Sequence, residues 1–233
     1  MNAEFESPQS DEGGGQWAVQ AALAPLLEMN TQCVESLCAM ARRPGLWPPL
    51  VAGASEVWRA LTPTARQRLA AVPWLLVDAG FSRGDPWQGM GYDGVRDGPP
   101  LPVSTRWSGA PFFGEQARDF LRRVLVFSWH LSRTDPQLAR IALGISPLTA
   151  QHLSRLKLAE LDALAERYPD ALRPRWENSP GLWRMLLAAA RQEDGSRITE
   201  ASLQGFQLMA GRCVSPVSVP PPPPASAGAG AQP

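Results

Sequence analysis

Apolar side chains recur at steps of three and four residues along most of the chain, which is the spacing of amphipathic helices. The longest early run extends from Gln16 to Arg43 and predicts one helix that ends before Pro44. Pro25 marks a point at which this helix can break, because proline removes a backbone donor. A second helix is expected over residues 47–61.

Helix starts are marked by a side chain that can cap the first turn, in most cases followed by proline. Proline suits the first helical position because its missing N–H would have no partner there. Such signals occur at Thr62, Asp135, Ser146, Ser179 and Thr199. Their recurrence along the chain predicts an all-α fold.

Two segments stand apart from the helical pattern. Residues 74–81 (WLLVDAGF) favour either a strand or the buried end of a helix, and residues 172–179 (LRPRWENS) are expected to be extended. Between these segments, the helix expected over 113–134 is apolar on most of its surface towards its end. This helix is therefore expected to be central to the core.

Composition divides the chain into helical and loop-rich parts. Residues 82–113 are dense in glycine, proline and aspartate and are expected to form a long ordered loop. This loop joins an N-terminal helical subdomain at 16–81 to a C-terminal helical module at 114–212. Residues 1–15 and the proline-rich tail 213–233 are expected to be disordered. The predicted architecture is an orthogonal bundle of two helical subdomains with a long central loop.

Net charge limits the partners and the location of the protein. Apolar residues make up 44% of the chain, and 22 basic residues balance 22 acidic ones. A neutral chain has no long-range field that would draw it to nucleic acid or to an anionic membrane. No apolar run approaches the ~18 residues of a membrane span, and the polar first residues do not resemble a signal peptide. The protein is therefore expected to be cytoplasmic, with no membrane contact.

Residues that could carry enzyme chemistry are few and scattered. Two histidines and three cysteines (Cys33, Cys38 and Cys213) show no metal-ligand spacing, so no metal or cofactor is expected. The cysteines are expected to be small buried side chains, and His130 is expected to pack in the core. No phosphate-binding glycine loop or serine elbow is present. The sequence therefore predicts no catalytic residue and a protein that is not an enzyme.

Residues 139–158 (ARIALGISPLTAQHLSRLKL) have the pattern of a helix-turn-helix. A short helix ends at Gly144, Ile145 closes the corner, and a new helix begins at Ser146-Pro147. The side chains expected on the exposed face of the second helix are Thr149, Gln151, His152 and Arg155. Threonine, glutamine and arginine can read base edges. A helical corner with a solvated outer face has the same pattern, so both interpretations stay open.

The same region resembles the FlhD type of flagellar transcriptional activator subunit. The matching pieces are Leu143-Gly144-Ile145, Ala150, Leu156 with Leu158, Leu164-Ala165, and Leu172 with Arg173 and Arg175. The resemblance covers residues 139–187 of the 233. It implies an all-α regulatory subunit that forms a dimer, works through a partner protein and contacts DNA only with that partner. Arg173 and Arg175 are a second set of candidate contact residues.

These observations predict a non-enzymatic bacterial regulatory or adaptor protein that acts through protein–protein contacts, with transcriptional regulation through a partner as one role. The alternative is a direct helix-turn-helix DNA-binding regulator. A third interpretation is an enzyme whose site is built around the central loop, near Asp78, Asp85 or Asp93.

Overall fold

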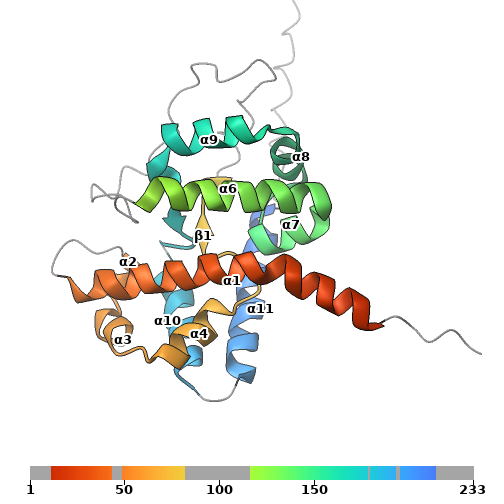
Figure 1. Ribbon diagram of the computed structural model, residues 1–233. Helices are drawn as coiled ribbons and strands as arrows, with labels where there is room; N and C mark the ends of the chain where they lie inside the picture. The colour runs from red at the N-terminus through yellow and green to blue at the C-terminus, as the bar shows by residue number, and fades with distance from the viewer. Residues whose placement is uncertain (1–11, 44–48, 82–115, 178, 193–194, 214–233) are drawn as a thin grey trace, which may run out of the picture.

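The computed structural model describes residues 12–43, 49–81, 116–177, 179–192 and 195–213 (Figure 1). The helices are α1 (Glu12–Arg42), α2 (Pro49–Ala52), α3 (Ser55–Arg59), α4 (Pro63–Ala70), α6 (Ala117–Thr134), α7 (Pro136–Leu143), α8 (Pro147–Arg155), α9 (Leu158–Arg167), α10 (Pro180–Arg191) and α11 (Ser196–Cys213). A 3-10 turn spans Pro169–Ala171, and two short strands are β1 (Val77–Asp78) and β2 (Arg173–Pro174). The predicted all-α class is confirmed. The predicted loop 82–113 lies outside the described residues, as does the tail beyond Cys213.

The helices form two layers with the strand pair between them (Figure 1). Helices α6 to α9 make the upper layer, while α1 to α4, α10 and α11 make the lower one, and α1 also contacts α6. Helix α10 packs against α2 and α4 as well as against α11. The C-terminal helices therefore return to the N-terminal part of the chain. The helices of the expected 114–212 module are shared between the two layers.

Helix α1 is longer than expected and does not break. It begins at Glu12, inside the segment 1–15 that was expected to be disordered, and continues through Pro25. Pro25 is exposed. The helix therefore continues past the one backbone hydrogen bond that Pro25 cannot make, with the proline on its exposed side. The expected end before Pro44 is confirmed, since α1 ends at Arg42.

Three of the expected caps form as the sequence predicts. Thr62 Oγ1 accepts from Ala65 N at 3.2 Å and Ser146 Oγ accepts from Thr149 N at 3.0 Å. Asp135 Oδ1 accepts from the backbone N–H groups of Gln137 and Leu138, at 3.1 and 2.9 Å. Each cap satisfies donors that the first turn leaves without a partner.

Three other helix predictions are wrong in detail. Ser179 precedes α10 but makes no capping hydrogen bond with its side chain. Thr199 lies inside α11, which begins at Ser196. The helix expected over 47–61 is instead two short helices, α2 and α3, separated by a turn at Gly53. Glycine favours such an interruption because it lowers helix stability.

The strand expected within 74–81 forms, but it is only two residues long. Val77 pairs with Pro174 and Asp78 pairs with Arg173 in an antiparallel register. The extended segment predicted after Leu172 is therefore the partner strand, β2. This pairing joins the N-terminal part of the chain, which contains β1, to the C-terminal part, which contains β2.

The core is one continuous cluster of buried apolar side chains. Fully buried tryptophans anchor it: the Trp58 and Trp183 rings lie 5.6 Å apart between centroids. Trp74 meets Trp176 and Phe206 edge-on, at 5.8 and 5.0 Å. Such tilted contacts suit the charge distribution of aromatic rings.

One buried polar side chain fixes the chain between α4 and β1. The Asn30 amide nitrogen, on α1, donates to the carbonyls of Ala70, Val72 and Trp74 at 3.1, 3.3 and 2.8 Å. Its oxygen accepts from Leu76 N at 2.7 Å. Asn30 therefore satisfies backbone groups that the non-helical segment leaves unpaired inside the protein.

Candidate functional site

The predicted helix-turn-helix is present as a corner between α7 and α8. Helix α7 ends at Leu143, Gly144 adopts a left-handed conformation with φ 59°, and α8 begins at Pro147. Ile145 is fully buried under the corner. Helix α6 packs against both α7 and α8, so the corner belongs to a three-helix unit.

Gly144 is required at this corner for two reasons. Its positive φ is unfavourable for residues with a side chain. A Cβ atom at this position would also lie 2.7 Å from Arg175 Nη1 and 2.7 Å from Met209 Sδ. The corner is therefore packed tightly against Arg175, which follows β2, and against α11.

The structure corrects the exposure expected for Arg173 and Arg175, which are both buried. The Arg175 guanidinium donates to the carbonyls of Leu75, Val77 and Leu143, at 2.8, 3.3 and 2.7 Å. It therefore holds the last turn of α7 against the chain around β1. Because Arg175 is only 5% exposed, it stabilises the fold and is not available to contact a partner.

Thr149 was expected on the exposed face of the second helix, but the structure shows that it is buried. Its side chain is 2% exposed and its hydroxyl lies 2.9 Å from Ser146 Oγ. On α8, Thr149 lies on the same side as the buried Leu153, one turn later. Thr149 therefore belongs to the cap and the core.

The exposed face of α8 contains three of the predicted residues. Gln151 and Arg155 are exposed and His152 is half-buried. Leu148, which is 45% exposed, lies on the same face because helical neighbours recur every three or four residues. We define Leu148, Gln151, His152 and Arg155 as the α8 surface. A role for these residues in binding stays a prediction.

A basic and aromatic cluster adjoins the C-terminal end of the α8 surface. Trp129 Nε1, on α6, donates to Leu156 O at 2.7 Å, and the Arg133 guanidinium lies 4.8 Å from the centre of the Trp129 ring. Lys157 and Leu158 follow Leu156 directly, and both are exposed. We call Trp129, Arg133, Lys157 and Leu158 the basic end. Within the described part of the chain, neither Arg133 nor Lys157 forms an ion pair.

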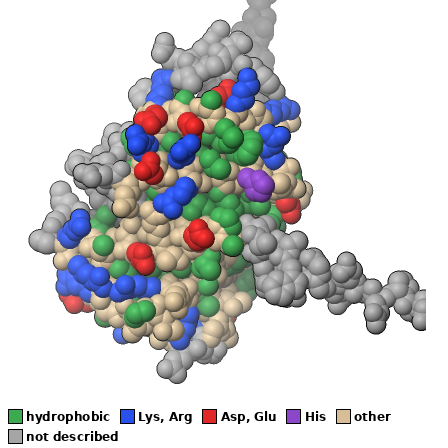
Figure 2. Space-filling model, in the orientation of Figure 1, with side chains coloured by type: hydrophobic (Ala, Val, Ile, Leu, Met, Phe, Trp, Pro, Cys, Tyr) green, Lys and Arg blue, Asp and Glu red, His purple; other side chains and the backbone are tan. Residues whose placement is uncertain are grey.

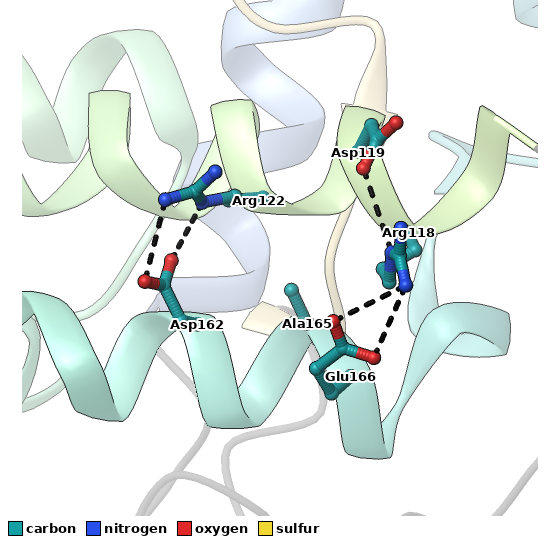
Figure 3. A pocket seen from close by; sticks show the side chains of 6 residues that line it. All are labelled: Arg118, Asp119, Arg122, Asp162, Ala165 and Glu166. Carbon is teal, nitrogen blue, oxygen red and sulfur yellow. Dashed lines mark hydrogen bonds and ion pairs between the residues drawn. The ribbon is translucent and has the colours of Figure 1, made fainter.

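The opposite end of the contact between α6 and α9 has a different electrostatic character (Figure 3). Arg122 Nε lies 2.6 Å from Asp162 Oδ1, and Arg118 Nη1 lies 3.3 Å from Glu166 Oε1. These groups and Asp119 line a shallow pocket in which the charged groups face one another. The negative charges of Glu166, which has the larger effect, and of Asp119 raise the pKa of the Arg118 guanidinium. The arginines here are therefore engaged with carboxylates.

The histidine and cysteine side chains show no arrangement for metal binding in the described residues. His130 is exposed, so its expected packing in the core is wrong. Cys33 and Cys38 are buried as expected, and burial raises the pKa of both thiols. Among the residues that the structure describes, no cluster of three or more acidic, histidine or cysteine side chains could hold a metal ion. Over the same residues, no helix has both the length and the apolar character of a membrane span.

Comparisons with protein-family models, with curated proteins and with solved structures gave no match. The resemblance to the FlhD type of subunit therefore stays a prediction from residues 139–187.

Sequence reasoning missed several exposed residues around the corner. Leu148 has a signal, since its spacing from Gln151 and Arg155 puts it on their helix face. Arg133 and Lys157 have no such signal, because their proximity comes from the packing of α6 against the end of α8.

Proposed function

We propose that this chain is a non-enzymatic regulatory adaptor that binds a partner protein through the α8 surface. The supporting observation is that one rigid helix corner presents an exposed leucine beside polar and basic side chains. Apolar anchors surrounded by polar groups are typical of protein interfaces. The expected cytoplasmic location is part of this proposal.

The rigidity of the corner supports this assignment. Ser146 caps α8, Gly144 fits closely against Arg175 and Met209, and Arg175 closes the end of α7. A surface held in one conformation loses little entropy when it binds. The α8 surface is therefore prepared for a partner before contact.

A second candidate function is direct DNA binding. The observation that favours it is the packing of α6 on both α7 and α8, the arrangement in which helix-turn-helix proteins place their second helix in the major groove. Gln151 and Arg155 would then face base edges. The neutral net charge of the chain counts against it.

The experiment is capture of partners by the tagged full-length chain from its native cell, with and without nuclease. We expect a protein that stays bound after nuclease and is lost with the double variant Leu148→Ser/Arg155→Ala. The matched control is Arg118→Ala, on α6, which should leave capture unchanged. Capture that nuclease removes would support the DNA-binding function, and capture unchanged by the double variant would refute the α8 surface.

A further inference from the structure

The charges along α6 and α9 are sorted by position. Towards the start of α6, arginines pair with the carboxylates of α9 (Figure 3). At the end of α6, Arg133 stacks on Trp129, while Lys157 precedes α9. Figure 2 shows acidic and basic side chains mixed on one part of this layer and basic side chains beside exposed hydrophobic ones on another.

The carboxylates nearest to the basic end in sequence are occupied by backbone donors. Asp135 accepts from the first turn of α7, and Glu160 Oε2 accepts from Lys157 N at 2.6 Å. Both carboxylates serve as helix caps and do not reach the cationic groups of Arg133 or Lys157 as ion pairs. The Arg133 guanidinium therefore lies on the Trp129 ring, and Lys157 follows directly on Leu156, whose carbonyl accepts from the Nε1 of that ring.

Apolar groups lie among these cations. Leu158 is 54% exposed and Leu148 is 45% exposed. Arg155 lies seven positions after Leu148 on α8, which corresponds to roughly 10 Å of helix. The surface is therefore long enough for about two turns of a partner helix, with apolar contacts near both ends.

We propose that the α8 surface and the basic end together bind an acidic amphipathic helix of the partner protein, with apolar residues on one face and carboxylates beside them. This inference rests on the proposed function and names the chemistry of its partner. Carboxylates complement Arg133 and Lys157, while leucine-like anchors cover Leu148 and Leu158. A DNA duplex supplies negative charge, but it offers little apolar surface that could cover Leu148 and Leu158.

The test is selection from a library of 16-residue peptides displayed on phage, with the full-length chain as bait. We expect enrichment of peptides rich in Asp and Glu with apolar residues three or four positions apart. The selected peptide should bind about tenfold more weakly to Arg133→Glu/Lys157→Glu. It should bind Arg118→Ala, the matched control on the same helix, as well as it binds the wild type.

Three outcomes would overturn the inference: selected peptides that are not acidic, binding that the double charge reversal leaves unchanged, or no selected peptide at all. Competition by a 24-base-pair duplex, with no peptide binding, would show that the surface binds nucleic acid instead. Failure of this test leaves the proposed function standing if nuclease-resistant capture still depends on Leu148 and Arg155. If the peptide selection fails and nuclease-resistant capture does not depend on Leu148 and Arg155 either, the proposed function itself is refuted.

Discussion

At the level of single residues, two buried polar side chains fix the segment between α4 and β1. Asn30 holds it from α1, and Arg175, which follows β2, joins it to the end of α7. Both act through backbone groups that regular structure does not satisfy, where a missing partner is costly. The resemblance of residues 139–187 makes Arg175 a candidate contact residue, and arginine is usually exposed, so its burial is not evident from the sequence.

Replacement of Arg175 should therefore destabilise the protein severely. Arg175→Met removes the donors of three carbonyls and should lower the free energy of unfolding by about 3 kcal/mol or more. Arg175→Lys should also destabilise, because one ammonium cannot reproduce the guanidinium fork. Urea unfolding measures both values. A loss below about 0.5 kcal/mol, the size of an ordinary surface change, would contradict the structural role.

The buried thiols make a pH-dependent prediction. Burial raises the pKa of Cys33 and Cys38 above the ordinary value of 9.0. Above this pH the unfolded thiols ionise while the folded thiols keep their protons. The unfolded state then binds fewer protons, so stability should fall as the pH rises above 9.0.

Two measurements check this prediction in a Cys213→Ser background. Neither thiol should react with Ellman's reagent at pH 8 until urea unfolds the protein. The loss of stability above pH 9 should be smaller in the variant that also carries Cys33→Ala and Cys38→Ala. Rapid labelling of the folded protein would contradict the burial of these thiols.

At the level of elements, the sequence predicts local features better than long-range ones. The caps at Thr62, Asp135 and Ser146 need only neighbouring residues, and all three form. The pairing of β1 with β2 and the burial of Arg175 depend on residues about one hundred positions apart. The basic end likewise needs α6 to meet the end of α8. Hydrophobic spacing does not encode such contacts.

The corner between α7 and α8 makes the element-scale prediction. Gly144→Ala should lower the free energy of unfolding by about 2 kcal/mol, because the left-handed conformation is unfavourable for alanine and its Cβ would meet Arg175 Nη1 at 2.7 Å. The control is Gly181→Ala in α10, where a Cβ meets no atom within 4 Å. That variant should be neutral or stabilising by up to about 1 kcal/mol. Equal effects in thermal or urea unfolding would refute the tight corner.

At the level of the whole molecule, the two layers differ in what they contain: one holds the buried tryptophans, and the other presents the α8 surface. The lower layer and the strand region contain the buried tryptophans of a core that continues into the upper layer. The upper layer presents a helix corner whose exposed face combines leucine with polar and basic groups. The neutral net charge of the whole chain is compatible with a local basic end, because Arg118 and Arg122 of α6 are paired with Glu166 and Asp162 of α9.

The most direct test of the α8 surface is site-specific photocrosslinking in the native cell. A photoreactive phenylalanine replaces Leu148 in one variant and Glu56, which is highly exposed on α3, in the control. We expect one crosslinked protein that appears with the Leu148 variant, survives nuclease and disappears when Arg155→Ala is added. Crosslinks of equal yield from Glu56, or crosslinks only to DNA, would contradict an adaptor that binds its partner through α8.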